Sequence, residues 1–421
     1  MDGSDREEAE AGEHMTLKAL SGLFSIVSDC FAEASNLWYC AKHGCPVHNG
    51  LCSRTNSQNT MKTSIARLAG VIALSGLIAS GASSFAQTDP AVKAYKIVRT
   101  TQTMGTGGID YVYADNDNGR LYVPRGNQVL VFDLDSLKAT GSITNARARG
   151  VAIDPKAQHG FSSSSPVVMW DAKTLETIKT IEVQGRPDGI HFEPLTERVY
   201  VFSHSEPNAT VIDSKDGSVV GTIDLGGAPE QAASDGKGNL YVCIEDKDNI
   251  AVVDVKTLKV TSHYDLAGKG GGPAGLGFDA KNRILFAMCH EPQTCVVLNA
   301  DDGKILATLP IGRGTDGGGF NPNTMEAYSS QGDGTLTIIK ENSPTSFEVE
   351  QTVQTKSRAK TCTLDTKKNQ IIVITIEPLP NAPGTTPPAG GEQPGGGKKG
   401  GKKGGGGGPG DAGYNRRWAL T

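Results

Sequence analysis

Charged side chains recur at one position of a phrase that is repeated along this 421-residue chain. Two copies read GVAIDP at residues 150–155 and GIHFEP at residues 189–194, where a short apolar run is closed by an acidic residue. Five positions before that residue, seven copies of the phrase place Asp110, Arg149, Asp188, Glu230, Ala274, Asp316 and Lys360. Six of these seven residues are ionisable, whereas charged residues make up 21% of the whole chain. A ring of such mixed charge could hold a divalent cation, a polar ligand or the side chains of a partner.

The same charges could also pair with one another and bind nothing. Arg149 has Asp110 and Asp188 in the neighbouring copies, and exposed ion pairs contribute little net stability. The sequence leaves both interpretations open. An experiment distinguishes the two interpretations. Neutralising Asp188 and Asp316 should abolish ligand binding if the ring binds a ligand, and should lower the melting temperature if the ring is structural.

Cysteine and histidine give weaker signals in the same region. Cys289 and Cys295 flank an expected hairpin turn, so a disulfide between them is conceivable in an oxidising compartment, although we favour buried free thiols. The other two cysteines are Cys243 and Cys362. We expect the histidines to be structural, because they lack partners at metal-ligand spacing in the sequence. They are His191, His204, His263 and His290.

An upstream cluster of thiols and imidazoles has a composition that suits tetrahedral zinc. It comprises Cys30, Cys40, His43, Cys45, His48 and Cys52. Its two-residue spacing joins a cysteine to a histidine and never two cysteines, so we do not predict a zinc site there.

Catalytic motifs are missing from the sequence. There is no G-x-S-x-G elbow for a nucleophilic serine, and no C-x-x-C-H for covalent haem. The glycine-rich stretch at residues 268–273 lacks the Lys-Ser/Thr that a phosphate loop needs. No catalytic residue is therefore assigned, and no cofactor is evident apart from a divalent cation that the charged ring could hold.

A second repeated phrase shows which elements must position the ring. An apolar pair, an Asp or Asn and a turn recur at Asp133, Asp171, Asp213, Asp254 and Asn299. The steps are 38 to 45 residues long, which is the length of one four-stranded propeller blade. With seven copies of the first phrase, the pattern predicts an all-β fold, a seven-bladed β-propeller over residues 87–377.

These phrases resemble those of the YVTN-repeat β-propellers, which include the YncE-like exported proteins. The Tyr-Val-Thr-Asn tetrapeptide that gives this family its name is never present whole. Its positions are occupied by LYVP at residues 121–124, VYVF at 199–202 and LYVC at 240–243. The resemblance covers about 290 residues and implies the fold rather than an activity. Similar propellers include lactone hydrolases and subunits of periplasmic oxidoreductases, so an enzymatic role stays open as an alternative.

The seventh blade is incomplete in the sequence. Residues 361–365 and 370–377 supply two strands, and we expect residues 94–100 to supply the fourth from the other end of the chain. No third strand is recognised. Residues 378–412 form a Pro/Gly/Lys-rich segment that we expect to be disordered, and residues 413–421 read as a C-terminal remnant left by truncation or a frameshift.

Residues 61–86 have the three parts of a secretory signal peptide: a basic start, an apolar run, and small residues ending at Ala86. Because such a signal is read near an amino terminus, we interpret Met61 as the true start and residues 1–60 as a non-native extension or a disordered segment. Gln87 follows, so no lipid-anchoring cysteine is present. We expect a periplasmic or secreted protein with no membrane span in its mature part.

The composition limits the partners. A net charge of −5 without a concentrated basic face does not favour nucleic acid. We expect a monomeric exported scaffold that binds a periplasmic or extracellular protein, a glycan or a small ligand at the channel mouth. The alternative is a metal-dependent, lactonase-like hydrolase or a periplasmic oxidoreductase subunit on the same propeller.

Overall fold

The computed structural model describes residues 95–377 and 416–420. The signal-peptide segment 61–86, the extension 1–60 and the tract 378–412 lie outside the described residues, so those predictions stay predictions. The described part contains one short helical turn, η1 (Glu245–Lys247), and no helix long and apolar enough to cross a bilayer. The rest of the regular structure consists of β-strands.

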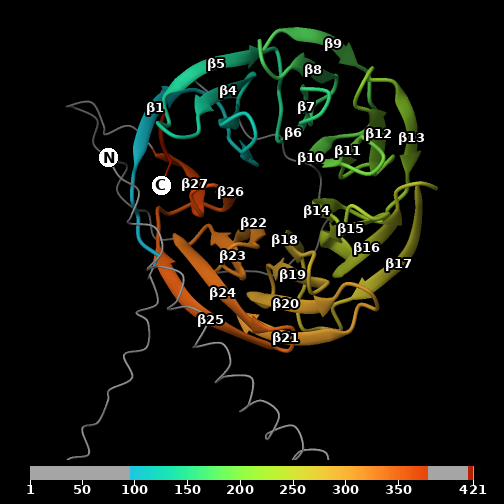
Figure 1. Cartoon of the computed structure of the whole chain (residues 1–421), viewed down its shortest axis with the longest axis vertical. Helices are drawn as coiled ribbons and strands as arrows, with labels where there is room; N and C mark the ends of the chain where they lie inside the picture. Colours follow the sequence, from blue (N-terminus) through green and yellow to red (C-terminus); the bar gives the residue numbers. More distant parts are fainter. Residues whose placement is uncertain (1–94, 378–415, 421) are drawn as a thin grey trace, which may run out of the picture. The chain divides into compact units, whose positions relative to one another are not determined.

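Seven antiparallel sheets of four strands each make up the described fold and lie radially around a common centre (Figure 1). Blade 1 comprises β2 (Tyr113–Asp115), β3 (Arg120–Arg125), β4 (Gln128–Asp133) and β5 (Ala139–Thr144). Blade 2 comprises β6 (Val151–Asp154), β7 (His159–Ser162), β8 (Val167–Asp171) and β9 (Thr177–Ile181). Blade 3 comprises β10 (Pro187–Glu193), β11 (Arg198–Ser203), β12 (Ala209–Asp213) and β13 (Val219–Ile223).

The next three blades follow the same order along the chain. Blade 4 comprises β14 (Pro229–Ser234), β15 (Asn239–Ile244), β16 (Asn249–Asp254) and β17 (Lys259–Asp265). Blade 5 comprises β18 (Pro273–Asp279), β19 (Ile284–Cys289), β20 (Thr294–Asn299) and β21 (Ile305–Pro310). Blade 6 comprises β22 (Thr315–Asn321), β23 (Glu326–Gln331), β24 (Thr335–Ser343) and β25 (Ser346–Gln354). The predicted all-β fold of seven four-stranded blades is confirmed.

Blade 7 combines strands from both ends of the described chain. Its order is β26 (Thr361–Asp365), β27 (Gln370–Glu377), β28 (Arg416–Leu420) and β1 (Thr101–Gly105). Residues 416–420, which the sequence assigned to a remnant, are therefore the third strand that was not recognised. The fourth strand begins at Thr101, so its predicted position at 94–100 is wrong by several residues.

The aspartate of the second repeated phrase closes the turn between the third and fourth strands. The Oδ1 atom of Asp171 accepts hydrogen bonds from the backbone N–H groups of Lys173 and Thr174, both at 2.8 Å. The last residue of the turn has a positive φ, which favours glycine and costs other residues strain. It is Leu137 (53°), Leu175 (67°), Gly217 (68°), Leu258 (55°) or Gly303 (72°). The phrase is thus a turn signal with a defined backbone conformation.

Apolar side chains on both faces of the blades form the core between neighbouring sheets. Trp170 of β8 is fully buried and lies directly opposite Gly160 of β7. A Cβ atom at Gly160 would lie 2.1 Å from Trp170 Cε2, closer than any real contact. This glycine is therefore required by packing.

We expect Gly160→Ala to lower the free energy of unfolding by about 1–3 kcal/mol, because an overpacked core forces side chains from their rotamers. Urea denaturation measures the change. Gly108→Ala is the matched control, since a Cβ atom there meets no atom within 4 Å. Equal stability of the two variants would contradict the packing argument.

Candidate functional site at the channel mouth

The predicted charged positions lie where the first strand of each blade begins. Asp188, Glu230 and Asp316 lie within β10, β14 and β22, next to a register shift in each pairing with the second strand. Such bulges redirect a side chain from the sheet face. Asp110, Arg149 and Lys360 lie in the segments before β2, β6 and β26, and Ala274 holds the uncharged fifth place.

Contacts between these side chains show that they converge. Arg149 Nη1 lies 3.0 Å from Asp110 Oδ2 and 3.4 Å from Asp188 Oδ2, which joins blades 1, 2 and 3. Lys360, which directly precedes the first strand of blade 7, forms an ion pair through its Nζ atom with Asp316 of the neighbouring blade 6. The hydroxyl of Tyr111 donates a hydrogen bond to Glu230, so a residue of blade 1 reaches blade 4. The structure thus brings together the six charged residues that the sequence singled out.

Negative charge exceeds positive charge at this mouth. Four carboxyl groups face two cationic side chains, and the carboxyl groups are largely buried. Burial raises the pKa of Asp110 to about 6, against the lowering effects of Lys360 and Arg149. Burial also raises the pKa of Asp188, and Glu230 and Asp316 add to this effect. A cationic group at the mouth would relieve this excess of negative charge.

Two histidines and a glutamate add a second set of ionisable groups. His204, Glu245 and His290 each follow the last residue of the second strand in blades 3, 4 and 5. His204 Nε2 lies 2.9 Å from Glu230 Oε1 and 3.5 Å from Asp188 Oδ2. His290 Nδ1 lies 3.4 Å from Glu245 Oε1. The sequence predicts a structural role for both histidines, although their shared position after the second strand is itself a signal in the repeat.

These acidic neighbours set the charge of the histidines. The carboxylate of Glu230 raises the pKa of His204, and burial opposes it. Glu245 in the same way raises the pKa of His290. His290 in turn lowers the pKa of Glu245, so this pair favours its ionised form.

A cavity of about 290 Å³ lies along the first strands of the blades. Gln231 crosses it, because its Oε1 accepts hydrogen bonds from the backbone N–H groups of Leu276 and Gly318, both at 3.1 Å. His191 also lines this cavity, and burial lowers its pKa to about 4. The imidazole is therefore neutral at physiological pH, and its Nε2 is buried without a hydrogen-bond partner among the described residues.

The four cysteines of the described chain are buried free thiols. Cys295 lies opposite Met288 in the sheet, so its side chain shares a face with Met288. Cys289 is the next residue along and points to the other face, because side chains alternate along a strand. The disulfide considered between Cys289 and Cys295 is therefore not formed, and the favoured free thiols are what the structure has.

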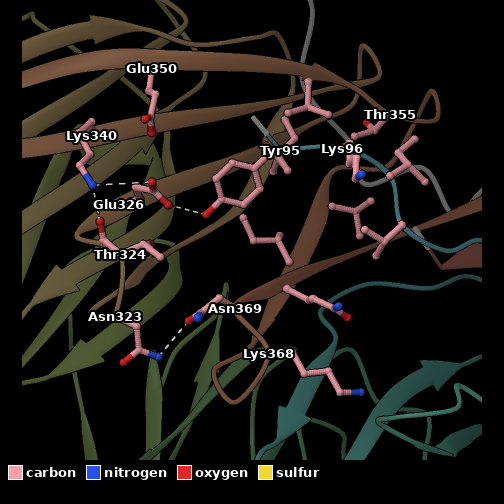
Figure 2. Close-up of a pocket in the computed structure, with 17 residues that line it drawn as sticks. Tyr95, Lys96, Asn323, Thr324, Glu326, Lys340, Glu350, Thr355, Lys368 and Asn369 are labelled. Atoms are coloured by element: carbon pink, nitrogen blue, oxygen red, sulfur yellow. Dashed lines mark hydrogen bonds and ion pairs between the residues drawn. The ribbon is translucent and has the colours of Figure 1, made fainter. Parts of the chain in front are cut away.

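A larger cavity of about 800 Å³ lies away from the ring, between residues 95–98 and the outer parts of blades 6 and 7 (Figure 2). In Figure 2 the Tyr95 hydroxyl points toward Glu326, to which it donates a hydrogen bond. Tyr95 is also held by Gln351, whose side chain bonds both its backbone N–H and its carbonyl at 2.7 and 2.8 Å. These contacts anchor the segment before β1, and we assign the cavity no chemistry.

Comparisons with known proteins support the fold. No protein-family model matches the chain, and no curated protein matches it. A structure of U3-55K has 11% sequence identity and a TM-score of 0.55, over 65% of this chain and 90% of that one. A crystal structure of RRP9 WD40 repeats has 11% sequence identity and a TM-score of 0.55, over 65% of this chain and 89% of that one. A chain in the crystal structure of the mitotic checkpoint complex has 13% sequence identity and a TM-score of 0.56, over 66% of this chain and 91% of that one.

The protein has a β-propeller fold like that of WD40 proteins. At 11–13% identity these similarities show the fold and carry no activity.

Proposed function

We propose that this propeller is an exported scaffold of the YVTN-repeat, YncE-like type, which binds a partner through the charged ring at its channel mouth. The observation that carries the proposal is the convergence of six ionisable residues from six blades with acidic groups in excess. Export rests on the signal-peptide pattern at residues 61–86, and the repeat type rests on the phrases quoted above.

The charge of the ring suggests the chemistry of the partner. Buried carboxyl groups whose pKa values are raised lack sufficient positive charge around them. A lysine or arginine side chain of a periplasmic protein, or another cationic group, would supply it. Charge complementarity of this kind chiefly sets specificity and association rate.

The test is a pull-down from periplasmic extract with the full chain and with its Asp188→Asn/Asp316→Asn variant. We expect the variant to bind a specific partner at least about 10-fold more weakly than the parent, which corresponds to a loss of about 1.4 kcal/mol in binding free energy. Its melting temperature should stay within about 4 °C of the parent, because Arg149 and Lys360, the cationic partners of the two aspartates, are half exposed, and ion pairs that solvent can screen contribute up to about 1 kcal/mol.

The control for this pull-down is Glu176→Gln/Glu182→Gln, which removes the same charge from exposed positions beside β9. It should retain the partner fully. If the ring variant retains the partner equally well, the ring is not the binding surface. If the ring variant instead unfolds at a much lower temperature, the ring is structural.

A second function, metal-dependent hydrolysis of a lactone, is favoured by one observation. An imidazole and two carboxyl groups lie together at the mouth, within reach of one divalent ion. Hydrolysis of a simple lactone by the purified chain, dependent on added zinc, would support this function. Unchanged hydrolysis in a His204→Gln variant would argue against it.

A further inference from the structure

Three ligand-type side chains meet at one point of the channel mouth. Asp188 comes from the first strand of blade 3, His204 from the loop after its second strand, and Glu230 from the first strand of blade 4. One ligand atom from each lies within 4.8 Å of the other two. Within the described residues, this is the grouping of histidine, cysteine or carboxyl side chains that meets such a distance.

The separations match those of a metal centre. Two ligands of a tetrahedral zinc ion, each at about 2.0–2.1 Å, lie about 3.3 Å from one another. His204 Nε2 is 2.9 Å from Glu230 Oε1 and 3.5 Å from Asp188 Oδ2, on either side of that value. Both separations from His204 are within a few tenths of an ångström of that value, and ligand atoms of Asp188 and Glu230 lie within 4.8 Å of each other.

Surrounding side chains hold two of these ligands in place. Tyr111 donates a hydrogen bond to the Oε2 atom of Glu230, which leaves Oε1 directed at His204. Arg149 lies beside Asp188 but is closer to Asp110, so it keeps a partner if Asp188 turns to a metal. Outer partners of this kind orient metal ligands and raise their affinity.

The alternative is that a protonated His204 merely forms ion pairs with the two carboxylates. The orientation of the imidazole is not explained by ion pairing alone. His204 Nε2 is shielded from solvent and close to both carboxylates, yet it makes no hydrogen bond of good geometry with either. An N–H group would be aligned with an acceptor, whereas a lone pair would face a point between the ligands.

We propose that Asp188, His204 and Glu230 bind one zinc ion at the channel mouth. A single imidazole with two carboxylates suits zinc better than calcium or magnesium, which take oxygen ligands. Three protein ligands leave a fourth position for water or a group from the channel, as in zinc sites that are open. The proposal does not depend on a protein partner, so its failure and that of the pull-down are separate results.

The chain offers a matched control in blade 5. His290 occupies the place of His204 there, but among the described residues only one carboxyl group, that of Glu245, lies within ion-pair distance of it. A site with one carboxylate and one imidazole should bind zinc far more weakly than the three-ligand site. His290→Gln therefore removes an equivalent imidazole without touching the proposed ligands.

The experiment uses the full chain with Cys30, Cys40, Cys45 and Cys52 changed to serine, because the upstream thiols could themselves bind zinc. The protein is freed of metal with a chelator, and zinc binding is measured by titration calorimetry and by the metal content after dialysis. We expect one zinc ion per chain and a melting temperature that rises with zinc.

Asp188→Asn, His204→Gln and Glu230→Gln should each weaken zinc binding by at least about 10-fold, the lower end of what outer partners alone cost. His290→Gln should bind like the parent. Melting without zinc identifies any variant that fails to fold, and the parent alone still decides the stoichiometry. A folded parent that binds no stoichiometric zinc, or three folded ligand variants that bind it as tightly as the parent, would overturn the proposal.

Discussion

Replacing Glu341 by glutamine should stabilise the propeller above pH 7 and flatten its dependence on pH. Glu341 is 3% exposed at the far end of β24, and burial, together with nearby Asp279, raises its pKa from 4.5 to about 7. Its Oε1 accepts a hydrogen bond from Asn282 at 2.7 Å, but its Oε2 and the Oδ2 atom of Asp279 are buried without a donor. A proton on Glu341 supplies the missing donor between the two carboxyl groups.

The direction of the pH effect follows from proton binding. Between pH 4.5 and about 7, folded Glu341 holds its proton more tightly than the unfolded chain does. The free energy of unfolding therefore falls as the pH rises through this range, by at most about 3 kcal/mol for such a shift. Glutamine donates to Asp279 at every pH, so Glu341→Gln should recover most of that loss at pH 8.

Urea denaturation at pH 5 and pH 8 measures the effect. The parent should lose stability between the two values, and the variant should lose less. Glu348→Gln is the control, because this glutamate of β25 is exposed and bonds only with Asn342 among its described side-chain partners. A Glu341→Gln variant that is less stable than the parent at pH 8 would show that the carboxylate is needed in its ionised form.

The repeated phrases predicted the blades because each phrase encodes a local structure. The aspartate that closes each turn and the following residue with positive φ depend on neighbours in sequence, as at Asp171 and Leu175. The outer strand of blade 7 was harder to place. Residues 94–100 have the composition of a strand and precede the first repeat, which predicts the strand there, but Ile97 and Val98 are 49% and 64% exposed, and the polar segment from Thr101 forms the strand. At the outer edge of a blade, hydrophobicity does not mark a strand.

The charged ring could be predicted because each blade contributes one residue at a constant offset. His204 could not be found in the same way, since its two partners come from different strands, and Glu230 from the next blade. Spacing in sequence carries no information about such a meeting until the blades are placed side by side. The cysteine pair shows the opposite case, where the alternation along β19 and β20 alone excludes the disulfide.

Deleting residues 413–421 should destabilise the propeller strongly, because it removes the third strand of blade 7. β28 pairs with β27 over four residue pairs and with β1 over five. Without it, β1 has no neighbour in its sheet, and β27 presents a row of unpaired backbone groups. A loss of even three net hydrogen bonds amounts to about 3 kcal/mol, on the order of 6 °C in melting temperature.

Melting temperature and size-exclusion chromatography test this expectation, since an open strand edge also promotes association between molecules. The control deletes residues 385–408 and keeps β28. Glu377 pairs with Arg417, so the ends of this connection lie side by side and a much shorter link can join them. Loop length itself costs little, about 0.6 kcal/mol per doubling. If the chain without residues 413–421 melts at the same temperature and elutes at the same volume as the parent, β28 is dispensable for the stability of the seventh blade.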